Sequence, residues 1–245
     1  MEKSKNNKPL IAITGASSGI GLACAKMFAA QGFPLLLMAR RVELIEELKL
    51  NNCIAAKVDV RDFQEFKKAV EKGEKEFGPV DLLINNAGVM PVDWFLSQDH
   101  NEKMDMIDIN LKGVINGMDC VLSNMTKRNH GTIINVGSVA GRWTSDWRAV
   151  YNATKFGVHA LTEAVRREVS DSGVRICLIA PAIVDTNLLS TSKNLEIVDK
   201  YKTIKKKINN GLTSEEIAQQ ILYIYSLPQH IAIKELVISH VNQKI

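Results

Sequence analysis

Tyr151 and Lys155 stand four residues apart, in the run Tyr-Asn-Ala-Thr-Lys, within a stretch whose pattern predicts a helix. Side chains with this spacing lie on one helix face, about 5–6 Å apart at Cβ. An ammonium group beside a phenol favours the phenolate and lowers a pKa that starts at about 10. Such a phenol can exchange a proton with an alcohol or a carbonyl near neutral pH. The same spacing also fits an ordinary surface pair, so it becomes informative only together with the rest of the chain.

A glycine-rich segment near the start of the chain predicts an anion-binding turn. An apolar run at residues 10–13 leads into residues 14–21, Thr-Gly-Ala-Ser-Ser-Gly-Ile-Gly, and a helical pattern follows. Glycines let the backbone approach a pyrophosphate, and free N–H groups at the start of a helix face its charge. The order of strand, glycine turn and helix therefore favours a nucleotide site.

Taken in order, these and other segments resemble the short-chain dehydrogenase/reductase family over nearly the whole chain. Residues 14–21 match its TGxxxGIG turn, and residues 85–88 match its NNAG segment. Residues 181–186 resemble its PGxVxT segment, with Ala182 in place of the usual glycine. Residues 227–238, followed by Gln243, resemble most closely the NADP-preferring branch that contains 3-hydroxy acid and serine dehydrogenases. The order and spacing of the family's Asn-Ser-Tyr-Lys tetrad are matched by Asn110, Ser138, Tyr151 and Lys155.

Composition fits a globular enzyme. The 245 residues are 46% hydrophobic and 24% charged, and the net charge is +4. Scattered basic residues do not favour a nucleic-acid or membrane partner. The four cysteines and five histidines show no metal-ligand spacing, so no metal is expected. The polar opening does not resemble a signal peptide, and no apolar run approaches the roughly 20 residues of a membrane span, which predicts a cytoplasmic protein.

Continuous apolar runs alternate with helical patterns along the chain. Strands buried on both faces read as such runs, and the alternation predicts an α/β fold, a doubly wound parallel sheet with helices on both faces. The resemblance implies a Rossmann-type sheet of seven strands in the order 3-2-1-4-5-6-7, within a single domain spanning residues 1–245. The predicted strands are 10–14, 34–39, 53–58, 82–85, 132–136, 175–179 and 235–239. The predicted helices are 19–31, 42–50, 62–77, 101–127 and 149–170.

Residues 187–212 are polar and lysine-rich and lack a sustained helical period. A long segment at this position is expected to be a substrate lid, and the alternative is a plain surface excursion. Thr213 and Glu216 then form a capping-box pattern, which predicts the start of a further helix.

The end of the second predicted strand indicates NADP(H). Proteins that prefer NAD place an acid there to bind the ribose diol, whereas this chain has Ala39 followed by Arg40 and Arg41. Guanidinium groups suit a 2′-phosphate, and Ser17 could add a hydroxyl contact. Alternatively, both arginines begin the next helix in solvent.

Further cofactor contacts follow from the resemblance. Asp59 and Val60 would border the adenine, residues 86–88 would lie along the ribose, with Asn86 also bracing the central strands, and residues 183 and 186 would meet the carboxamide. The complete predicted set is Gly15, Ser17, Ser18, Gly19, Ile20, Gly21, Arg40, Arg41, Asp59, Val60, Asn86, Ala87, Gly88, Tyr151, Lys155, Pro181, Ile183 and Thr186.

The resemblance also implies roles in hydride-transfer chemistry. Tyr151 would exchange the proton, Ser138 would hydrogen-bond the reacting oxygen, and Lys155 would lower the pKa of Tyr151 and bind the ribose. Asn110 would hold a water that relays protons to solvent.

The segment between Ser138 and Tyr151 is expected to wall the substrate pocket through Arg142, Trp143, Trp147 and Arg148. Either arginine could grip a carboxylate, which favours a small-molecule carbonyl/alcohol substrate such as a short 3-hydroxy or 3-oxo acid. A 3-oxoacyl thioester reductase, a broad-range carbonyl reductase and a non-catalytic NADPH-binding regulator are the alternatives. The family also implies a homotetramer or homodimer.

Overall fold

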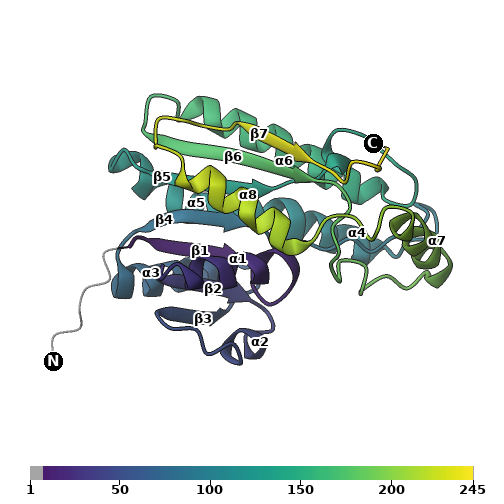
Figure 1. Cartoon of the computed structure of the whole chain (residues 1–245), viewed down its shortest axis with the longest axis horizontal. Coiled ribbons are helices and arrows are strands. Elements are labelled where there is room, and N and C mark those ends of the chain that lie inside the picture. The colour runs from purple at the N-terminus through teal and green to yellow at the C-terminus, as the bar shows by residue number, and fades with distance from the viewer. Residues whose placement is uncertain (1–7, 245) are drawn as a thin grey trace.

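Seven parallel strands form one sheet in the order β3-β2-β1-β4-β5-β6-β7 in the computed structural model, which describes residues 8–244 (Figure 1). The strands are β1 (Leu10–Thr14), β2 (Leu35–Ala39), β3 (Cys53–Lys57), β4 (Val80–Asn85), β5 (Gly131–Val136), β6 (Val174–Pro181) and β7 (Glu235–Ile238). The predicted fold class and strand order are confirmed, and the strands differ from their predicted ranges only at the ends.

The central strands are apolar along their length because both faces of the sheet are covered. Every residue of β1, β2, β4 and β5 is buried, whereas the edge strands β3 and β7 are mostly half-buried. In the register of β1 and β2, Thr14 pairs with Met38. The strand ends that lead to the candidate site are therefore level with one another.

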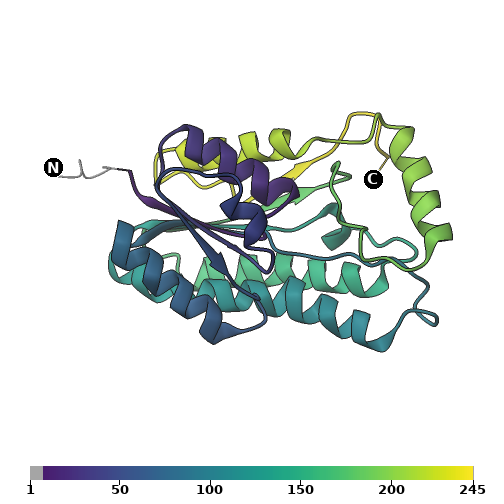
Figure 2. The ribbon, with the colours of Figure 1, turned by 90° about the horizontal axis from the view of Figure 1, so that it is seen from below.

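Two helical layers enclose the sheet (Figure 2). On one face of the sheet, Phe28 of α1 (Gly19–Ala30) packs edge to face on Tyr225 of α8 (Ser214–Ser226), with ring centroids 5.9 Å apart. The predicted capping box of Thr213 and Glu216 is present at the start of the last helix. The first layer consists of α1 (Gly19–Ala30) and α8 (Ser214–Ser226), and the second of α3 (Phe63–Phe77), α5 (Gly113–Lys127) and α6 (Ala149–Glu168).

The helix predicted over residues 101–127 is divided into three parts. After α4 (His100–Ile107) comes a π-helical turn (Asp108–Lys112), and α5 follows. A π-turn widens the backbone locally and frequently marks a functional site. This turn contains Asn110, so the break in the regular helix coincides with a predicted catalytic residue.

The helix predicted over residues 42–50 is much shorter than expected. The structure shows only α2 (Glu43–Glu46), because Lys49 and Asn52 adopt left-handed backbone conformations, with φ of 49° and 51°. A right-handed helix cannot continue through such residues.

Residues 187–212, predicted to lack a helical period, contain the helix α7 (Leu195–Lys206). Asn194 caps it by accepting a hydrogen bond from the N–H of Ile197. Ile197 and Val198 form its buried side, which joins an apolar cluster that includes Tyr151. Tertiary contacts thus order a segment whose own pattern is weak.

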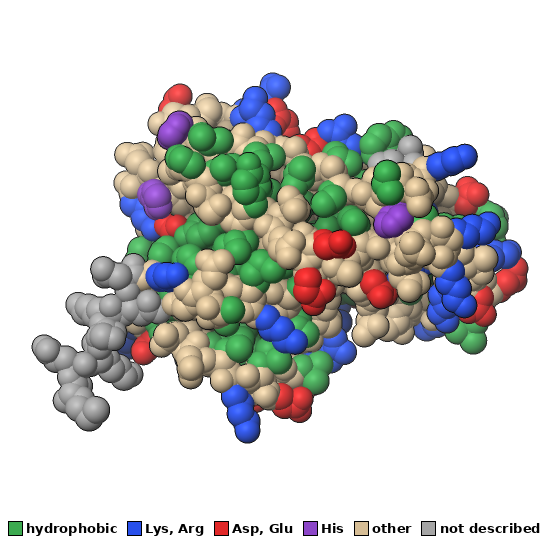
Figure 3. All heavy atoms as spheres, in the orientation of Figure 1, with side chains coloured by type: hydrophobic (Ala, Val, Ile, Leu, Met, Phe, Trp, Pro, Cys, Tyr) green, Lys and Arg blue, Asp and Glu red, His purple; other side chains and the backbone are tan. Residues whose placement is uncertain are grey.

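The polar opening of the chain, on which the absence of a signal peptide was predicted, lies largely outside the described residues. Between residues 8 and 244, no helix combines the length and the apolar character needed to cross a bilayer. On the face shown in Figure 3, lysine and arginine side chains are scattered rather than gathered into one patch.

Candidate active site

The strand order reverses at β1, which lies between β2 and β4. In open parallel sheets, ligands bind at such a reversal, in the crevice at the carboxyl ends of the strands. Thr14, Ala39 and Asn85 end these three strands. Helices α4 and α7 lie beyond the same ends of the sheet (Figure 1). The residues that bear on function are therefore expected along this edge.

The turn from β1 to α1 is shaped for an anion. Gly15 has a φ of 65°, which glycine adopts without strain, and a Cβ on Gly21 would lie 2.4 Å from the Gly15 carbonyl oxygen. Ser18 is the N-cap of α1, yet its side chain accepts no hydrogen bond from the helix, and the first turn has no acidic residue. Helix N–H groups and the positive end of the helix dipole therefore fit a pyrophosphate. Two further predicted residues of the turn, Ser17 and Ile20, are half-buried.

Thr14 and Asn86 join the ends of β1 and β4. The Thr14 hydroxyl accepts hydrogen bonds from the N–H groups of Asn86 and Ala87, at 2.9 and 3.0 Å. The Asn86 side chain donates to the carbonyls of Thr14 and Gly15, at 3.0 and 3.3 Å. The predicted bracing of the central strands by Asn86 is confirmed. Gly88 follows in the same loop, which lies directly beside the glycine turn.

Two arginines stand at the end of β2, as the sequence indicates. Ala39 is buried, whereas Arg40 and Arg41 are exposed. The Arg41 guanidinium lies 3.5 Å from the hydroxyl of Ser18, so it reaches the glycine turn. A positive group therefore lies beside the turn, where a ribose phosphate would be held.

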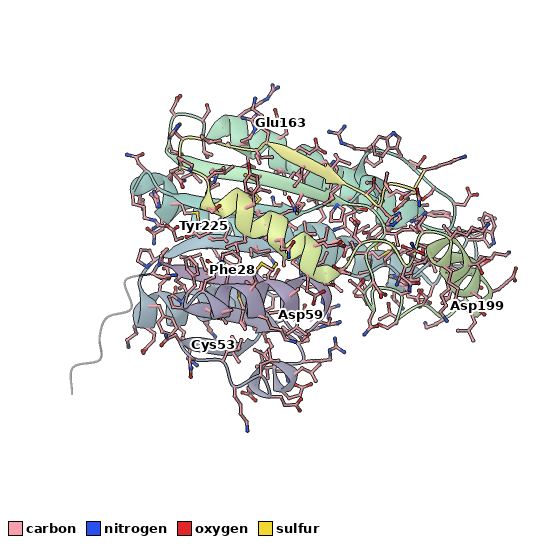
Figure 4. All side chains as sticks on the ribbon, viewed as in Figure 1. Phe28, Cys53, Asp59, Glu163, Asp199 and Tyr225 are labelled. Atoms are coloured by element: carbon pink, nitrogen blue, oxygen red, sulfur yellow. The ribbon has the colours of Figure 1, made fainter. Side chains whose placement is uncertain are left out.

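The end of β3 carries an ion pair that sequence reasoning missed. Hydrogen bonds from Arg61 hold the pKa of Asp59 below its usual value, and the charge of Arg40 acts in the same direction. Arg61 also pairs with Asp105 of α4 at 2.7 Å. Figure 4 shows Asp59 near this end of the sheet. Asp59 is thus committed to a structural pair at the border of the predicted adenine site.

Val60, predicted to border the adenine as well, faces the core. A Cβ on Gly113 would lie 2.7 Å from Val60 Cγ2, and the carbonyl of Val60 accepts a hydrogen bond from Asn116 at 2.8 Å. Its side chain is buried. The side chain of Val60 therefore packs against α5.

Tyr151 and Lys155 lie one turn apart on α6 and both are buried. Lys155 Nζ lies 5.7 Å from the centre of the Tyr151 ring and donates a hydrogen bond to the Val136 carbonyl at 2.8 Å. Burial raises the pKa of Tyr151 to about 12, although a hydrogen bond with Ser138 acts against this. Burial also lowers the pKa of Lys155 to about 8.

The lowering of the Tyr151 pKa by Lys155, predicted from their spacing, is therefore not what this structure shows. Desolvation of the phenol is the larger effect, because a buried phenolate loses its hydration. Burial therefore favours the protonated phenol of Tyr151.

Asn110 connects the π-turn to the loop after β4 and to α6. Its Oδ1 accepts a hydrogen bond from the N–H of Val89 at 2.9 Å. Its Nδ2 donates to the Val89 carbonyl at 3.0 Å and to Thr154 Oγ1 at 3.2 Å. Both N–H bonds of the amide are thus occupied. The side chain holds Val89 against the helix that carries Tyr151 and Lys155.

The backbone of Ser138 contacts His159, a residue that sequence reasoning did not single out. The Ser138 hydroxyl accepts a hydrogen bond from Ala140 N–H at 3.1 Å. The backbone N–H of Ser138 donates to His159 Nε2 at 3.5 Å. Burial lowers the pKa of His159, with Glu235 opposing the effect. The sequence did contain a signal for His159, because Tyr151, Lys155 and His159 follow one another at intervals of four residues and so share one helix face.

Arg142, predicted to grip a substrate carboxylate, already has a partner in the protein. Its guanidinium forms a two-pronged ion pair with Glu235 of β7. Trp143, also predicted to wall the pocket, is exposed. The Arg142 guanidinium is therefore already engaged by a carboxylate of the chain itself.

Trp147 and Arg148 lie where α7 meets the start of α6. Trp147 packs edge to face on Trp94, with ring centroids 5.9 Å apart. The guanidinium carbon of Arg148 lies 5.7 Å from the centre of the Tyr201 ring, which belongs to α7. Asp199, labelled in Figure 4, marks the position of that helix. These two predicted pocket residues therefore do contact the predicted lid.

The segment after β6 is hydrogen-bonded to the end of the chain. Pro181 ends β6, and Ala182 donates its N–H to the Ile238 carbonyl at 2.8 Å. Ala182 does not adopt a positive φ, so alanine in place of the family's glycine causes no backbone strain. Ile183 donates its N–H to Gln243 Oε1 at 3.1 Å.

Thr186 lies against the glycine turn from the other side. A Cβ on Gly19 would be only 3.1 Å from Thr186 Cγ2. The entry to residues 187–212 and the anion-binding turn are therefore in direct contact.

Comparison with known proteins gives a consistent result. Residues 9–196 match the family model of short chain dehydrogenases. An uncharacterized oxidoreductase of Listeria monocytogenes is 38% identical over 245 residues, covering 97% of this chain and 98% of that protein. The closed form of a serine dehydrogenase with NADP+ is 30% identical with a TM-score of 0.87, covering 96% of each chain. An alcohol dehydrogenase of the archaeon Thermococcus sibiricus, in complex with 5-hydroxy-NADP, is 26% identical with a TM-score of 0.82, covering 98% of this chain and 99% of that one.

Proposed function

Because the chain belongs to the short-chain dehydrogenase family of oxidoreductases, we propose that it interconverts a carbonyl and a secondary alcohol with NADP(H), using Tyr151 as the acid and base. The observation that carries this proposal is the buried group of Tyr151, Ser138 and Lys155. It lies at the end of the sheet that also carries the glycine turn, so an anion site and a proton donor share one edge of the sheet.

NADP(H), when bound, supplies or accepts the hydride. In the reductive direction, Tyr151 donates its proton to the carbonyl oxygen, and the Ser138 hydroxyl donates a hydrogen bond to the same oxygen. The raised pKa of Tyr151 keeps the phenol protonated for this step. The nearby Lys155 ammonium stabilises the phenolate that the step leaves behind. In the oxidative direction, Tyr151 must first lose its proton, which its raised pKa opposes, and the phenolate then takes the proton from the alcohol.

The preference for NADP(H) over NAD(H) rests on the end of β2. Ala39 has no carboxylate that would bind a ribose diol or repel a 2′-phosphate. Arg40 and Arg41 supply positive charge. The contact of Arg41 with Ser18 at 3.5 Å supports phosphate binding beside the glycine turn, rather than two arginines free in solvent. The bound cofactors named for the serine and alcohol dehydrogenases agree with this preference.

The proposed substrate is a short 3-hydroxy acid or its 3-oxo partner. The likeness to a serine dehydrogenase supports an acid with a hydroxyl at the third carbon. Residues 187–212 would act as the lid over it, since α7 packs in one apolar cluster with Tyr151. A 3-oxoacyl thioester or a range of neutral ketones are the competing substrates.

Oxidation of NADPH, with NADH as a control, tests the proposal on 3-oxo acids, 3-oxoacyl thioesters, diketones and quinones. We expect turnover of at least one class with NADPH, and its loss in Tyr151→Phe. Binding of NADPH without turnover of any class would instead favour a non-catalytic regulator.

We also propose that the protein self-associates through the outer faces of α4, α5 and α6. These helices expose large apolar side chains: Met104, Ile107, Ile115 and Phe156. A second copy that presents the same helices would cover them. Light scattering should give a tetramer or dimer, and a monomer at micromolar concentration would contradict the proposal.

A further inference from the structure

Two N–H donors beside the catalytic group are buried without a hydrogen-bond acceptor in the described part of the chain. They are Nε1 of Trp147 and Nε of Arg148. Most buried donors in folded proteins are paired, because an unpaired donor has lost its hydration without compensation. Two such donors on neighbouring residues indicate that this place is built for an acceptor from outside the chain.

Arg148 also lacks an anionic partner. No carboxylate of residues 8–244 lies within ion-pair distance of it, although Arg142, in the same loop, is paired with Glu235. The charge of Arg148 lowers the pKa of both Tyr151 and Tyr201, against the larger effect of burial. The guanidinium therefore lies close enough to Tyr151 for its charge to act on the phenol.

The backbone around these donors is held in a costly shape. Trp147 has a φ of 63°, a left-handed conformation that is rare for a bulky side chain. Such strain persists only where surrounding contacts impose it, and it clusters at functional sites. Here the contacts are a hydrogen bond from Asp93 N–H to the Trp147 carbonyl at 3.0 Å and the packing of Trp94 on the Trp147 ring.

The predicted lid contributes the remaining wall. Tyr201 of α7 faces the Arg148 guanidinium with its ring, at 5.7 Å. An aromatic face is attractive to a cation and leaves the edge of the guanidinium open for planar hydrogen bonding. A carboxylate at that edge would be shielded from water by α7, which strengthens a charge-assisted hydrogen bond.

We infer that Arg148, together with the indole N–H of Trp147, binds the carboxylate of a short oxo or hydroxy acid, and that Tyr201 covers this subsite. Resting on the proposed function, the inference selects Arg148 over Arg142 and a free acid over a thioester. Arg148 stands three residues before Tyr151, at the start of the same helix. This spacing suits a short acid whose carbonyl lies at Tyr151 and whose carboxylate lies at Arg148, such as a 3-oxo acid.

The test compares 3-oxobutanoate with its methyl ester, which has the same carbonyl but no charge. In Arg148→Gln, KM for the acid should rise at least tenfold, while KM for the ester changes less than twofold. Arg148→Lys keeps the positive charge but not the paired N–H donors of the guanidinium, so its KM for the acid should lie between those of the wild type and Arg148→Gln. Lys72→Gln removes a charge from the exposed side of α3, outside the proposed subsite and its lid, and should change neither KM.

A second readout does not depend on turnover. Calorimetric titration of the protein with butanoate, which cannot be reduced, should detect binding to the wild type and at least tenfold weaker binding to Arg148→Gln. Equal losses on acid and ester, an acid-specific loss in Arg142→Gln instead, or unchanged butanoate binding in Arg148→Gln would each overturn the inference. If the wild type turned over no carbonyl but bound butanoate through Arg148, the proposed function would fail while the carboxylate subsite stood.

Discussion

Lys155 donates a hydrogen bond to the carbonyl of Val136, the last residue of β5, at 2.8 Å. The bond ties α6 to the strand that leads directly to Ser138. The ammonium is thus fixed by the backbone of the sheet, and it lies 5.7 Å from the centre of the Tyr151 ring. This buried hydrogen bond therefore helps to hold the helix of Tyr151 and Lys155 against the strand that precedes Ser138.

The buried ammonium makes stability depend on pH. Burial lowers the pKa of Lys155 from 10.5 to about 8, so between these values the unfolded chain binds more protons than the folded one. Stability must then rise with pH in that window. We expect the free energy of unfolding to increase by about 2 kcal/mol from pH 8 to 10, relative to Lys155→Met.

Urea unfolding of both proteins at a series of pH values measures this difference. The comparison should stop at pH 10, because above it the raised pKa of Tyr151 acts with the opposite sign. Parallel curves for the wild type and Lys155→Met would show that Lys155 is not held in the buried position described.

Asn110 is expected to support the structure of the site through its side chain. In Asn110→Ala, the N–H and carbonyl of Val89 lose their partners. The free energy of unfolding should fall by about 2 kcal/mol or more, and activity should fall with it. Asn101→Ala, in the exposed first turn of α4, serves as the matched control. Loss of activity in Asn110→Ala at unchanged stability would point to the proton relay instead.

The arginines after β2 should control the choice of cofactor. Replacing Arg40 and Arg41 together by alanine should raise KM for NADPH about 10- to 100-fold, the loss expected for charge-assisted hydrogen bonds, and leave KM for NADH nearly unchanged. Lys26→Ala, on the exposed side of α1, controls for the general loss of positive charge. Equal effects on both cofactors would remove the basis for the proposed NADP(H) preference.

Much of the fold was predictable because a parallel sheet leaves a strong local signal. Strands such as β1 and β4, buried on both faces, appear as unbroken apolar runs. The capping box of Thr213 and Glu216 is equally local, since its parts are three residues apart. The π-turn around Asn110 was not predictable, because its residues continue a helical pattern and only the surrounding contacts widen the backbone.

The environment of the site depends on partners distant in the sequence. The pairing of Arg142 with Glu235 joins residues 93 positions apart, and no local pattern announces it. Because such distant pairs are not visible locally, Arg142 and Arg148 were equal candidates for carboxylate binding in the sequence, although only Arg142 pairs with Glu235 in the structure. The same limit also explains the pKa of Tyr151, since spacing indicates the nearby Lys155 but not the depth of burial.

The central claim is that Tyr151 donates the proton, and Tyr151→Phe tests it most directly. The variant removes only the hydroxyl, so kcat for reduction of the best carbonyl substrate should fall by about 10²- to 10⁴-fold. The Kd of NADPH, followed by nucleotide fluorescence, should stay within about threefold of the wild type. Near-normal turnover by the folded variant would contradict the account, whatever the substrate.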